Sequence, residues 1–375
     1  MTHIASLTLT AFRNYEATSI DGLENNFIVL IGENGAGKTN CMEAISILSP
    51  GRGLRGATVM ECQSQSVKTP WAVSASIIDK DGDATRLGVG RDPQKPDKKI
   101  VRADGDTLKN QQELGDVLRT IWLTPQMDGL FLQGGSERRR FFDRLVASFD
   151  PAHTGRMTRY EKAMRDRLTL LKAEAEAGNT ADPTWLAALE SIMAETSVAI
   201  AAARIETRNR LQYVINHATL SEFPSAIIDL SGEVEEALSK RTALSVEDMV
   251  RDRLINIRKA DGHTGRTNFG VQRTDMAVTY NEKNVGAAQC STGEQKALLT
   301  TIILAHARMV AARYGAPPLL LFDEVAAHFD KKRRDALFDV LKAFKTQIWL
   351  SGQDKDQFTN LDNNRLLHIR DNVIL

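Results

Sequence analysis

The feature that most restricts the fold is a glycine-rich segment, GENGAGKT at residues 32–39, which follows an apolar run and precedes a helical pattern. It has the G-x-x-x-x-G-K-[ST] spacing of a phosphate-binding loop, in the strand–loop–helix context that such a loop needs. Gly35 and Gly37 let the backbone turn so that consecutive N–H groups point at phosphates. Lys38 is predicted to contact the β- and γ-phosphate oxygens, and Thr39 to bind Mg²⁺. The implied ligand is a nucleoside triphosphate.

A second segment far along the chain supplies the other half of such a site. A phosphate-binding loop needs a carboxylate at the end of a neighbouring strand to hold the metal. The sequence PPLLLFDEVAAHFD at residues 317–330 places Asp323 and Glu324 directly after an apolar strand. Asp323 is predicted to lie on the metal side, and Glu324 is the candidate general base. The long separation between the two segments excludes most small nucleotide kinases and GTPases.

Composition limits the class of protein. The chain has 375 residues, of which 42% are apolar and 26% charged, as in ordinary globular proteins. Its 48 basic and 48 acidic residues cancel, so binding to nucleic acid would need a local basic patch. The three cysteines stand far apart and predict free thiols rather than disulfides or a zinc site. No signal peptide or apolar run of about 20 residues is evident, so we expect a cytoplasmic protein without a membrane partner.

The order of predicted elements suggests an α/β domain interrupted by a helical insertion. Strand patterns occupy residues 4–12, 27–32, 71–78 and 86–90, and residues 90–99 read as an exposed loop. Two alanine-rich helices at 154–177 and 183–217 predict an antiparallel hairpin. A helix at 294–313, a strand at 318–322, a helix at 331–344 and a strand at 347–350 indicate a largely parallel sheet. The expected organisation is an ATPase domain from residues 1–135 and 285–375 around an inserted, mainly helical lobe at 136–284.

The segment QCSTGEQKALLT, residues 289–300, places polar residues at the start of an apolar helix. Ser291 and Glu294 match a capping box, in which each side chain binds the backbone N–H of the other. This interpretation leaves Gly293 unexplained, because glycine in a first helical turn weakens a helix unless something approaches its backbone. Two roles therefore stay open for the segment: a helix cap alone, or a cap that also presents Ser291 and Gly293 to a ligand.

The order of these motifs resembles the ABC-type ATPases. In that superfamily the signature serine and glycine close on the γ-phosphate held by a second subunit. Within it, the chain is similar nearly end to end to the RecF family of the SMC-like branch, and the fold implied is a Rad50/SMC-like P-loop ATPase head. The segments that carry the resemblance are LTLTAFRNY (7–15), GENGAGKTNCMEAISILSPGRGLR (32–55), SERRRFFDRLVASFDP (136–151), CSTGEQKAL (290–298) and LLLFDEVAAHFD (319–330).

The resemblance implies particular roles for residues of this chain. Lys38 and Glu324 would be catalytic, and Thr39, Asp323 and, in the sequence TPQ, Gln126 would serve the metal. The residues implied to contact ATP are Gly32, Glu33, Asn34, Gly35, Ala36, Gly37, Lys38, Thr39, Asn40, Arg13, Ser291, Gly293, Glu294 and Asp330. One departure stands at residues 270–275, GVQRTD, where the family usually has Gly-Pro-His-Arg-Asp-Asp; Arg273 and Asp275 are kept and the histidine is lost.

The function implied by the resemblance is that of a weak, Mg²⁺-dependent and DNA-dependent ATPase of recombinational repair and replication restart. It would form an ATP-dependent homodimer on gapped DNA without sequence preference, act with RecR, RecO and RecA in the SOS response to DNA damage, and lie in the cytoplasm with the nucleoid. An ABC transporter ATPase subunit is an alternative, but the sequence SGQD (351–354) offers no switch histidine. Another SMC/Rad50-like ATPase is a further alternative, although no long coiled coil is predicted.

Basic residues that could contact DNA gather in three segments, at 138–140, 156–172 and 331–334. A helix over residues 156–172 would place four cations three residues apart, as a slanting stripe suited to phosphates. A solvent-exposed helix face explains the same pattern equally well. The candidates are Arg138, Arg139, Arg156, Arg159, Lys162 and Arg165. No base-reading motif is present, so binding through the backbone and shape of DNA is expected.

Overall fold

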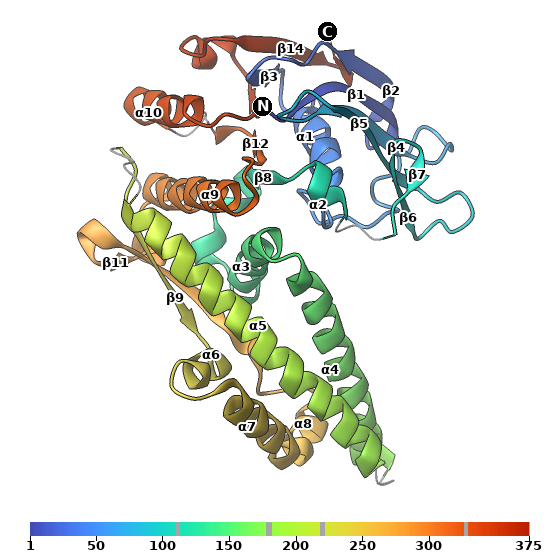
Figure 1. Cartoon of the computed structure of the whole chain (residues 1–375), viewed down its shortest axis with the longest axis vertical. Helices are drawn as coiled ribbons and strands as arrows, with labels where there is room; N and C mark the ends of the chain where they lie inside the picture. Colours follow the sequence, from blue (N-terminus) through green and yellow to red (C-terminus); the bar gives the residue numbers. More distant parts are fainter. Residues whose placement is uncertain (110–112, 178–181, 218–221, 326–328, 375) are drawn as a thin grey trace. The chain divides into compact units, whose positions relative to one another are not determined.

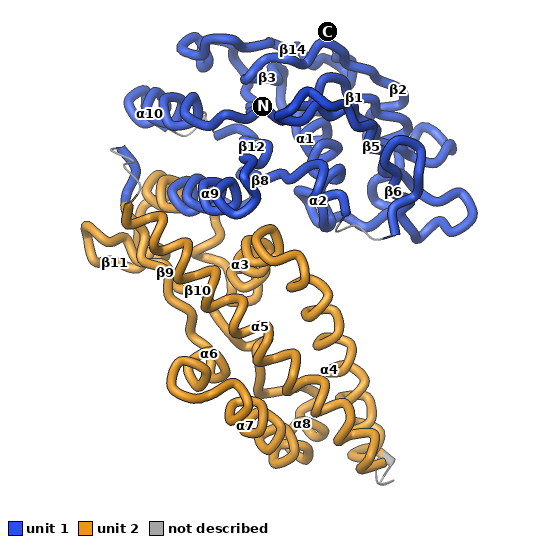
Figure 2. The backbone as a smooth tube through the Cα atoms, in the orientation of Figure 1, with its two compact units in different colours: residues 1–128, 219–224, 299–375 blue, residues 129–218, 225–298 orange. Residues whose placement is uncertain are grey.

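The computed structural model describes residues 1–109, 113–177, 182–217, 222–325 and 329–374. The chain forms two compact units (Figure 2). Unit 1 contains Met1–Asp128, Thr219–Pro224 and Leu299–Leu375, and unit 2 contains Gly129–Ala218 and Ser225–Leu298. These boundaries differ from the expected 135/136 and 284/285. The second unit begins earlier and takes in the start of the helix that follows the signature segment.

A mostly parallel sheet forms the centre of unit 1, in the strand order β15-β14-β3-β13-β12-β8 (Figure 1). All of its pairs are parallel except β14 with β15. Strands β3, β13, β12 and β8 are rich in buried apolar side chains, as expected of a sheet covered on both faces. The bounds are β3 Phe27–Ile31, β8 Thr120–Leu123, β12 Leu319–Phe322, β13 Ile348–Gly352, β14 Asn364–Arg370 and β15 Val373–Ile374. The parallel sheet predicted from the sequence is confirmed.

A second, antiparallel sheet in unit 1 has the order β2-β1-β4-β5-β6-β7. Helix α1 (Lys38–Ile47) contacts both β13 and β8 of the parallel sheet and β4 of the antiparallel one, so it is buried between the two sheets (Figure 1). This position fixes the start of α1, where the glycine-rich loop ends. The strands are β1 His3–Phe12, β2 Tyr15–Asp21, β4 Ala72–Ile78, β5 Ala84–Arg91, β6 Lys99–Ala103 and β7 Asp106–Thr107.

Helices α2, α9 and α10 belong wholly or partly to unit 1. The short helix α2 (Leu114–Val117) precedes β8, and α10 (Lys331–Lys342) precedes β13. Helix α9 (Thr292–Tyr314) starts at the signature segment in unit 2 and continues into unit 1, where it leads to β12. The helices predicted at 294–313 and 331–344 are confirmed within two residues at each end.

Unit 2 is built around two long helices, α4 (Ala152–Ala177) and α5 (Pro183–His217), which pack against each other as the predicted hairpin (Figure 1). Asp182 caps the start of α5, since the Thr184 N–H donates to Asp182 Oδ1 at 2.8 Å. The core of the unit includes Tyr160, Met193, Val250 and Phe269. Around the hairpin lie α3 Gly135–Phe149, α6 Glu233–Leu238, α7 Ala243–Asn256 and α8 Arg258–Thr264.

The inserted lobe also contains a sheet that the sequence did not reveal. Strand β10 (Asp275–Tyr280) pairs in antiparallel fashion with β9 (Ala226–Ser231) and with the two-residue β11 (Val285–Gly286). Both longer strands have only six residues and alternate imperfectly between buried and exposed positions. Such short patterns carry a weak signal in a single sequence, and the lobe is therefore less purely helical than expected.

Helix α5 is long and apolar enough to cross a membrane by length and composition alone. In unit 2, however, 61% of its most apolar window is buried against the rest of the protein. It also carries Glu190 and Arg204, two buried charged side chains that form ion pairs within the unit. The helix therefore has the features of the core helix of a globular unit.

Candidate nucleotide-binding site

The glycine-rich loop lies between β3 and α1, at the carboxyl end of the parallel sheet. Gly35 and Gly37 have φ values of 84° and 114°, in the region that favours glycine. The Lys38 ammonium folds back over the loop and donates to the carbonyls of Gly32 (2.7 Å) and Glu33 (2.8 Å). Burial lowers the pKa of Lys38, and the nearby Glu324 and Asp323 carboxylates oppose that change. The loop thus holds a buried cation beside two acids.

The two sequence-distant halves of the site meet directly. Thr39 Oγ1 donates to Asp323 Oδ2 at 2.7 Å, across 284 positions of the chain. The contact follows from strand order, because β13 pairs with both β3 and β12 and brings their carboxyl ends to one edge. Glu324 comes next, with a φ of 51°, which is uncommon for a residue other than glycine. Thr39 and Asp323, the two residues predicted for the metal, therefore lie in direct contact.

Ser351, at the end of β13, was not identified from the sequence. Its hydroxyl donates to Asp323 Oδ1 at 2.6 Å and accepts the Glu324 N–H at 2.9 Å. Ser351 is the first residue of the sequence SGQD, whose interpretation above rests only on its lack of a switch histidine. The signal that could have found Ser351 is its place at the carboxyl end of a buried strand, the edge where α/β sheets bind ligands.

Two further predicted residues are Gln126, implied to serve the metal, and Asp330, implied to contact ATP. Gln126 is exposed in the 3-10 turn Pro125–Met127 that follows β8. Strand β8 pairs with β12, and the Asp323 N–H donates to the Leu123 carbonyl at 2.9 Å, so Gln126 follows a strand that adjoins Asp323. Asp330 caps α10, accepting the Arg333 N–H at 2.8 Å. The residues between Val325 and Phe329 lie outside the described part of the chain.

Arg13, predicted to contact ATP, has protein partners in this structure. Its guanidinium donates to both oxygens of Glu43, at 2.6 and 2.9 Å, and to the Glu61 carbonyl at 2.6 Å. Arg55 donates to the same Glu43 at 2.9 Å. Glu43 lies on α1 and is fully buried. Arg13 therefore stabilises the position of the helix behind the glycine-rich loop.

The two residues after Arg13 support the loop more directly; they belong to the quoted segment LTLTAFRNY, but no role was assigned to them from the sequence. The Tyr15 hydroxyl donates to the Gly37 carbonyl at 3.1 Å, and a Cβ at Gly37 would stand only 2.7 Å from that hydroxyl oxygen. Asn40 Nδ2, in the first turn of α1, donates to Asn14 Oδ1 at 2.6 Å. The segment FRNY thus explains why position 37 requires glycine.

The remaining loop positions make backbone or surface contacts. The Gly32 N–H donates to the Gly352 carbonyl at 3.3 Å, and the Ala36 N–H to the Glu33 carbonyl at 3.2 Å. Asn34 Oδ1 accepts a hydrogen bond from Gln353 Nε2 at 3.0 Å. No group of three or more histidine, cysteine, aspartate or glutamate side chains that could hold a metal occurs in the described residues.

The signature segment forms the predicted capping box in unit 2. Glu294 Oε2 accepts the Ser291 N–H and Oγ–H, both at 2.9 Å, and the Glu294 N–H donates to Ser291 Oγ at 3.4 Å. Lys283 pairs with the other oxygen of Glu294. Lys283 first, and then the Ser291 groups, lower the pKa of Glu294 to about 2. Ser291 is exposed and Gly293 is half-buried at the helix tip.

Four of the six cations predicted to bind DNA are paired inside unit 2. Arg138 forms a two-bond contact with Asp275 (2.6 and 2.9 Å), and Arg139 donates to the Thr274 carbonyl at 2.9 Å. These two arginines fasten the start of α3 to the start of β10, which gives them a structural task. Arg156 pairs with Asp150 (2.5 Å), and Arg159 with Glu195 (3.0 Å).

Lys162 and Arg165 differ from the other four cations. Both are exposed on α4, and neither forms an ion pair with any residue that the structure describes. An unpaired, exposed cation can approach a phosphate without first breaking an internal bond. Of the four cations in the predicted stripe on α4, Lys162 and Arg165 are therefore the two that remain available to a DNA phosphate.

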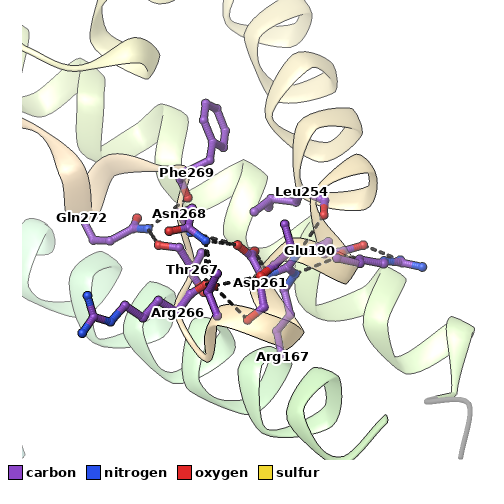
Figure 3. A network of polar contacts seen from close by, with 12 residues as sticks. Arg167, Glu190, Leu254, Asp261, Arg266, Thr267, Asn268, Phe269 and Gln272 are labelled. Atoms are coloured by element: carbon purple, nitrogen blue, oxygen red, sulfur yellow. Dashed lines mark hydrogen bonds and ion pairs between the residues drawn. The ribbon is translucent and has the colours of Figure 1, made fainter. Parts of the chain in front are cut away.

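Gln272, at the place of the family's histidine, has a structural role. Its Oε1 accepts the Tyr160 hydroxyl, and its Nε2 donates to the carbonyls of Thr267 (3.2 Å) and Phe269 (3.0 Å). Figure 3 shows Gln272 at one side of a polar network that extends to Arg167 and Asp261. The side-chain amide of Gln272 thus holds the loop before β10 together through hydrogen bonds to its backbone.

Comparison with known proteins agrees with the motif order and the geometry. The family model described as RecF/RecN/SMC N terminal domain matches residues 3–374. The chain is 44% identical over 360 residues to the DNA replication and repair protein RecF of Rhizobium rhizogenes, covering 96% of this chain and 94% of that protein. It is 42% identical over 369 residues to RecF of Caulobacter vibrioides, covering 97% and 95%.

The solved structures show the same fold. The recombination mediator protein RecF, in structures named for the RecFOR pathway, matches with TM-scores of 0.88 (RecF-ATPrS) and 0.87 (RecF-ATP). These matches are 20% and 19% identical and cover 100% of this chain and 97% of the other. The Smc head domain of Pyrococcus furiosus matches with a TM-score of 0.52 at 16% identity, covering 100% and 95%. With an ABC-type, SMC-like ATPase head and close relatives over its whole length, the chain belongs to the RecF family of DNA replication and repair proteins.

Proposed function

We propose that this protein is a Mg²⁺-dependent ATPase that dimerises on ATP and holds DNA at gaps during recombinational repair and replication restart. The observation that carries the proposal is the contact between Thr39 and Asp323 (2.7 Å), which joins a phosphate-binding loop to an acidic strand end. Relatives named RecF, 42 to 44% identical over nearly the whole chain, support the biological setting. Solved relatives named RecF-ATP and RecF-ATPrS support ATP as the nucleotide.

The residues present suit Mg²⁺. This cation is usually bound by one or two carboxylates together with phosphate oxygens and water, rather than by a cage of protein ligands. Thr39 and Asp323 would hold it, with Gln126 as a third candidate at the same edge of the sheet. A bound Mg²⁺ would neutralise charge that develops on the phosphates.

The chain's own residues would do the remaining work at the triphosphate. The loop N–H groups and the start of α1 would bind the phosphates. Lys38 would release the Gly32 and Glu33 carbonyls and turn its ammonium to the β- and γ-phosphate oxygens. Glu324 would accept a proton from the attacking water. The slow turnover typical of a clamp, in which hydrolysis reopens the dimer, is part of this proposal.

The second half of the site would come from another subunit. Ser291 and Gly293 are accessible at the tip of α9, and the capping box holds this tip in a fixed conformation. A polar helix tip of this kind suits the γ-phosphate bound by a second copy of the chain. The remaining parts of the proposal are RecR, RecO and RecA as partners, a role in the SOS response and a location in the cytoplasm with the nucleoid.

Sedimentation velocity tests the clamp. A Glu324→Gln protein should bind ATP and hydrolyse it poorly, so it should accumulate as a dimer with ATP and Mg²⁺, and more so with gapped duplex DNA. The same protein carrying Ser291→Ala should stay monomeric while still binding a fluorescent ATP analogue. Dimers that form without ATP, or without Ser291, would contradict the proposed mechanism.

A further inference from the structure

Three consecutive residues, the last two of β13 and the one after it, contact both halves of the nucleotide site. Ser351 Oγ donates to Asp323 Oδ1 at 2.6 Å, on the acidic side. The Gly352 carbonyl accepts the Gly32 N–H at 3.3 Å, and Gln353 Nε2 donates to Asn34 Oδ1 at 3.0 Å, on the side of the glycine-rich loop. Strand β13 lies between β3 and β12 in the sheet, which explains why its end reaches both.

Ser351 uses its full donor capacity in these contacts. A hydroxyl has one hydrogen to donate, and the Asp323 carboxylate takes it. The Ser351 oxygen in turn accepts the Glu324 N–H at 2.9 Å. Thr39 binds the opposite oxygen of Asp323, so the carboxylate is fixed from both sides. Ser351 is fully buried, and solvent water could not easily replace it.

The backbone conformation of Glu324 explains why the hydrogen bond from its N–H to Ser351 Oγ matters. With a φ of 51°, Glu324 adopts a left-handed conformation that a side chain disfavours and that the surroundings must hold in place. The Ser351 oxygen binds the N–H of that same residue. One hydroxyl therefore orients the Asp323 carboxylate and the Asp323–Glu324 peptide together.

We infer that Ser351 is a positioning residue, which sets Asp323 for the divalent cation and Glu324 for the attacking water. The inference rests on the proposed function and assigns to β13 a role beyond forming the sheet. Partners that orient metal ligands typically change metal affinity 10- to 100-fold when they are removed. The smaller end of that range is expected here, because Thr39 still holds one oxygen of Asp323.

Three variants isolate the hydroxyl. Ser351→Ala removes it without adding bulk. Ser351→Thr keeps it and adds a methyl group, and Ser351→Val adds equal bulk without a hydroxyl, so the Thr and Val proteins form a matched pair. Thr346→Val is the control, because Thr346 lies just before β13 and its buried hydroxyl has no hydrogen-bond partner among the described residues.

The main readout is the affinity for Mn²⁺ in the presence of ADP, measured from the electron paramagnetic resonance signal of free Mn²⁺. Ser351→Ala and Ser351→Val should weaken Mn²⁺ binding about tenfold. Ser351→Thr and Thr346→Val should bind Mn²⁺ like the unchanged protein. The Ser351→Ala and Ser351→Val proteins should also show a lower kcat at saturating Mn²⁺, with the KM for ATP little changed. The reason is that no hydroxyl then holds the backbone of Glu324.

The outcomes separate this inference from the proposed function. If the Val and Thr proteins bind Mn²⁺ equally well, the hydroxyl has no positioning role and the inference is wrong. If the unchanged protein binds neither ADP nor Mn²⁺ with ADP, the proposed ATPase function itself fails. Thermal unfolding of each variant, recorded without nucleotide, shows whether a loss of Mn²⁺ binding reflects unfolding; folded Val protein with normal Mn²⁺ affinity also overturns the inference.

Discussion

Glu43 is a fully buried carboxylate on α1, and two arginines from separate segments converge on it. Arg13 follows β1, and Arg55 lies in the loop after α1; their side chains are 20% and 29% exposed. A buried carboxylate is tolerated only when its charge is compensated. The ion pairs therefore hold the helix that starts at the phosphate-binding loop, and their loss should affect unit 1 as a whole.

Replacing Glu43 by glutamine should lower the free energy of unfolding by about 3 kcal/mol, because two half-buried guanidinium groups lose their counter-charge. Urea denaturation followed by circular dichroism measures the change. Arg55→Met is the comparison, with an expected loss of about 1 kcal/mol, since Arg13 still compensates Glu43 and the guanidinium of Arg55 is partly solvated. Equal stability of the Glu43→Gln and unchanged proteins would show that the charge contributes nothing.

Single-residue predictions from the sequence succeeded where the role depends on local spacing. The Ser291–Glu294 capping box and the start of α1 at Lys38 are determined within a few residues of chain. Thr39 and Asp323 were both predicted for the metal from their motifs, and the parallel sheet brings them into contact because α1 and Asp323 follow strands β3 and β12, which both pair with β13. Ser351 was missed, and Arg13 and Arg138 had unexpected partners, since a side-chain partner distant in sequence depends on strand order and loop path.

At the scale of elements, the exposed face of α4 carries the predicted DNA-binding cations that have no ion-pair partner among the described residues of unit 2. Lys162 and Arg165 are exposed and unpaired among the described residues, whereas Arg159 already pairs with Glu195. Each lysine or arginine that neutralises a DNA phosphate releases about one counterion, which steepens the dependence of affinity on salt. Replacing the unpaired cations Lys162 and Arg165 should therefore change the salt dependence of DNA binding more than replacing the paired Arg159.

Lys162→Ala and Arg165→Ala should each reduce the slope of log affinity against log salt by about one, with similar effects on DNA of different sequences. Fluorescence anisotropy with gapped duplex DNA, over a series of salt concentrations with ATP present, gives the slopes. Arg159→Ala is the matched control on the same helix and should change the slope less. If all three slopes equal that of the unchanged protein, α4 does not contact DNA.

A buried ionic network holds the far end of the α4–α5 hairpin (Figure 3). Arg167 on α4 is fully buried and donates to Glu190 Oε1 (2.9 Å), Asp261 Oδ2 (2.7 Å) and the Leu254 carbonyl (2.7 Å). These partners lie on α5, α8 and α7, so one side chain joins four helices. The sequence predicted the two long helices from their composition, but an internal arginine looks identical to a surface one until the packing is known.

Arg167→Met should destabilise unit 2 by about 3 to 5 kcal/mol, because it leaves buried carboxylates without their shared cation. Hydrogen exchange followed by mass spectrometry should show the loss in α4, α5, α7 and α8. Arg258→Met is the control: Arg258 also binds Glu190, but it is 25% exposed and its loss should cost less. Unchanged exchange in all four helices would mean that the network adds no stability.

Across the whole molecule, one continuous stretch of chain connects the signature segment to the acidic residue Asp323. The signature lies at the start of α9, in unit 2, and the chain passes through α9 to β12, whose end carries Asp323 in unit 1. Under the proposed function, the phosphate-binding loop of one chain and the signature of a second chain serve the same nucleotide. One subunit can then supply a residue that the other lacks, and this exchange can be measured.

Mixing two inactive variants should restore ATP hydrolysis. A Lys38→Met subunit cannot hold the triphosphate but retains Ser291. A Ser291→Ala subunit holds the triphosphate but cannot offer the serine to the nucleotide of its partner. In a head-to-tail pair of the two, one composite site contains Lys38 from one chain and Ser291 from the other. Steady-state phosphate release by the mixture, with DNA and Mg²⁺ present, should therefore exceed that of either variant alone, up to about half the unchanged rate if the two sites act independently.

The control is a double variant that carries both Lys38→Met and Ser291→Ala. Paired with the unchanged protein, it leaves no complete site in the mixed dimer, so adding it should inhibit turnover instead of restoring it. Restoration in the first mixture and inhibition in the second both follow from sites shared between chains. If Ser291 served the nucleotide of its own chain, both single variants would stay inactive in every mixture, and the shared site would have to be abandoned.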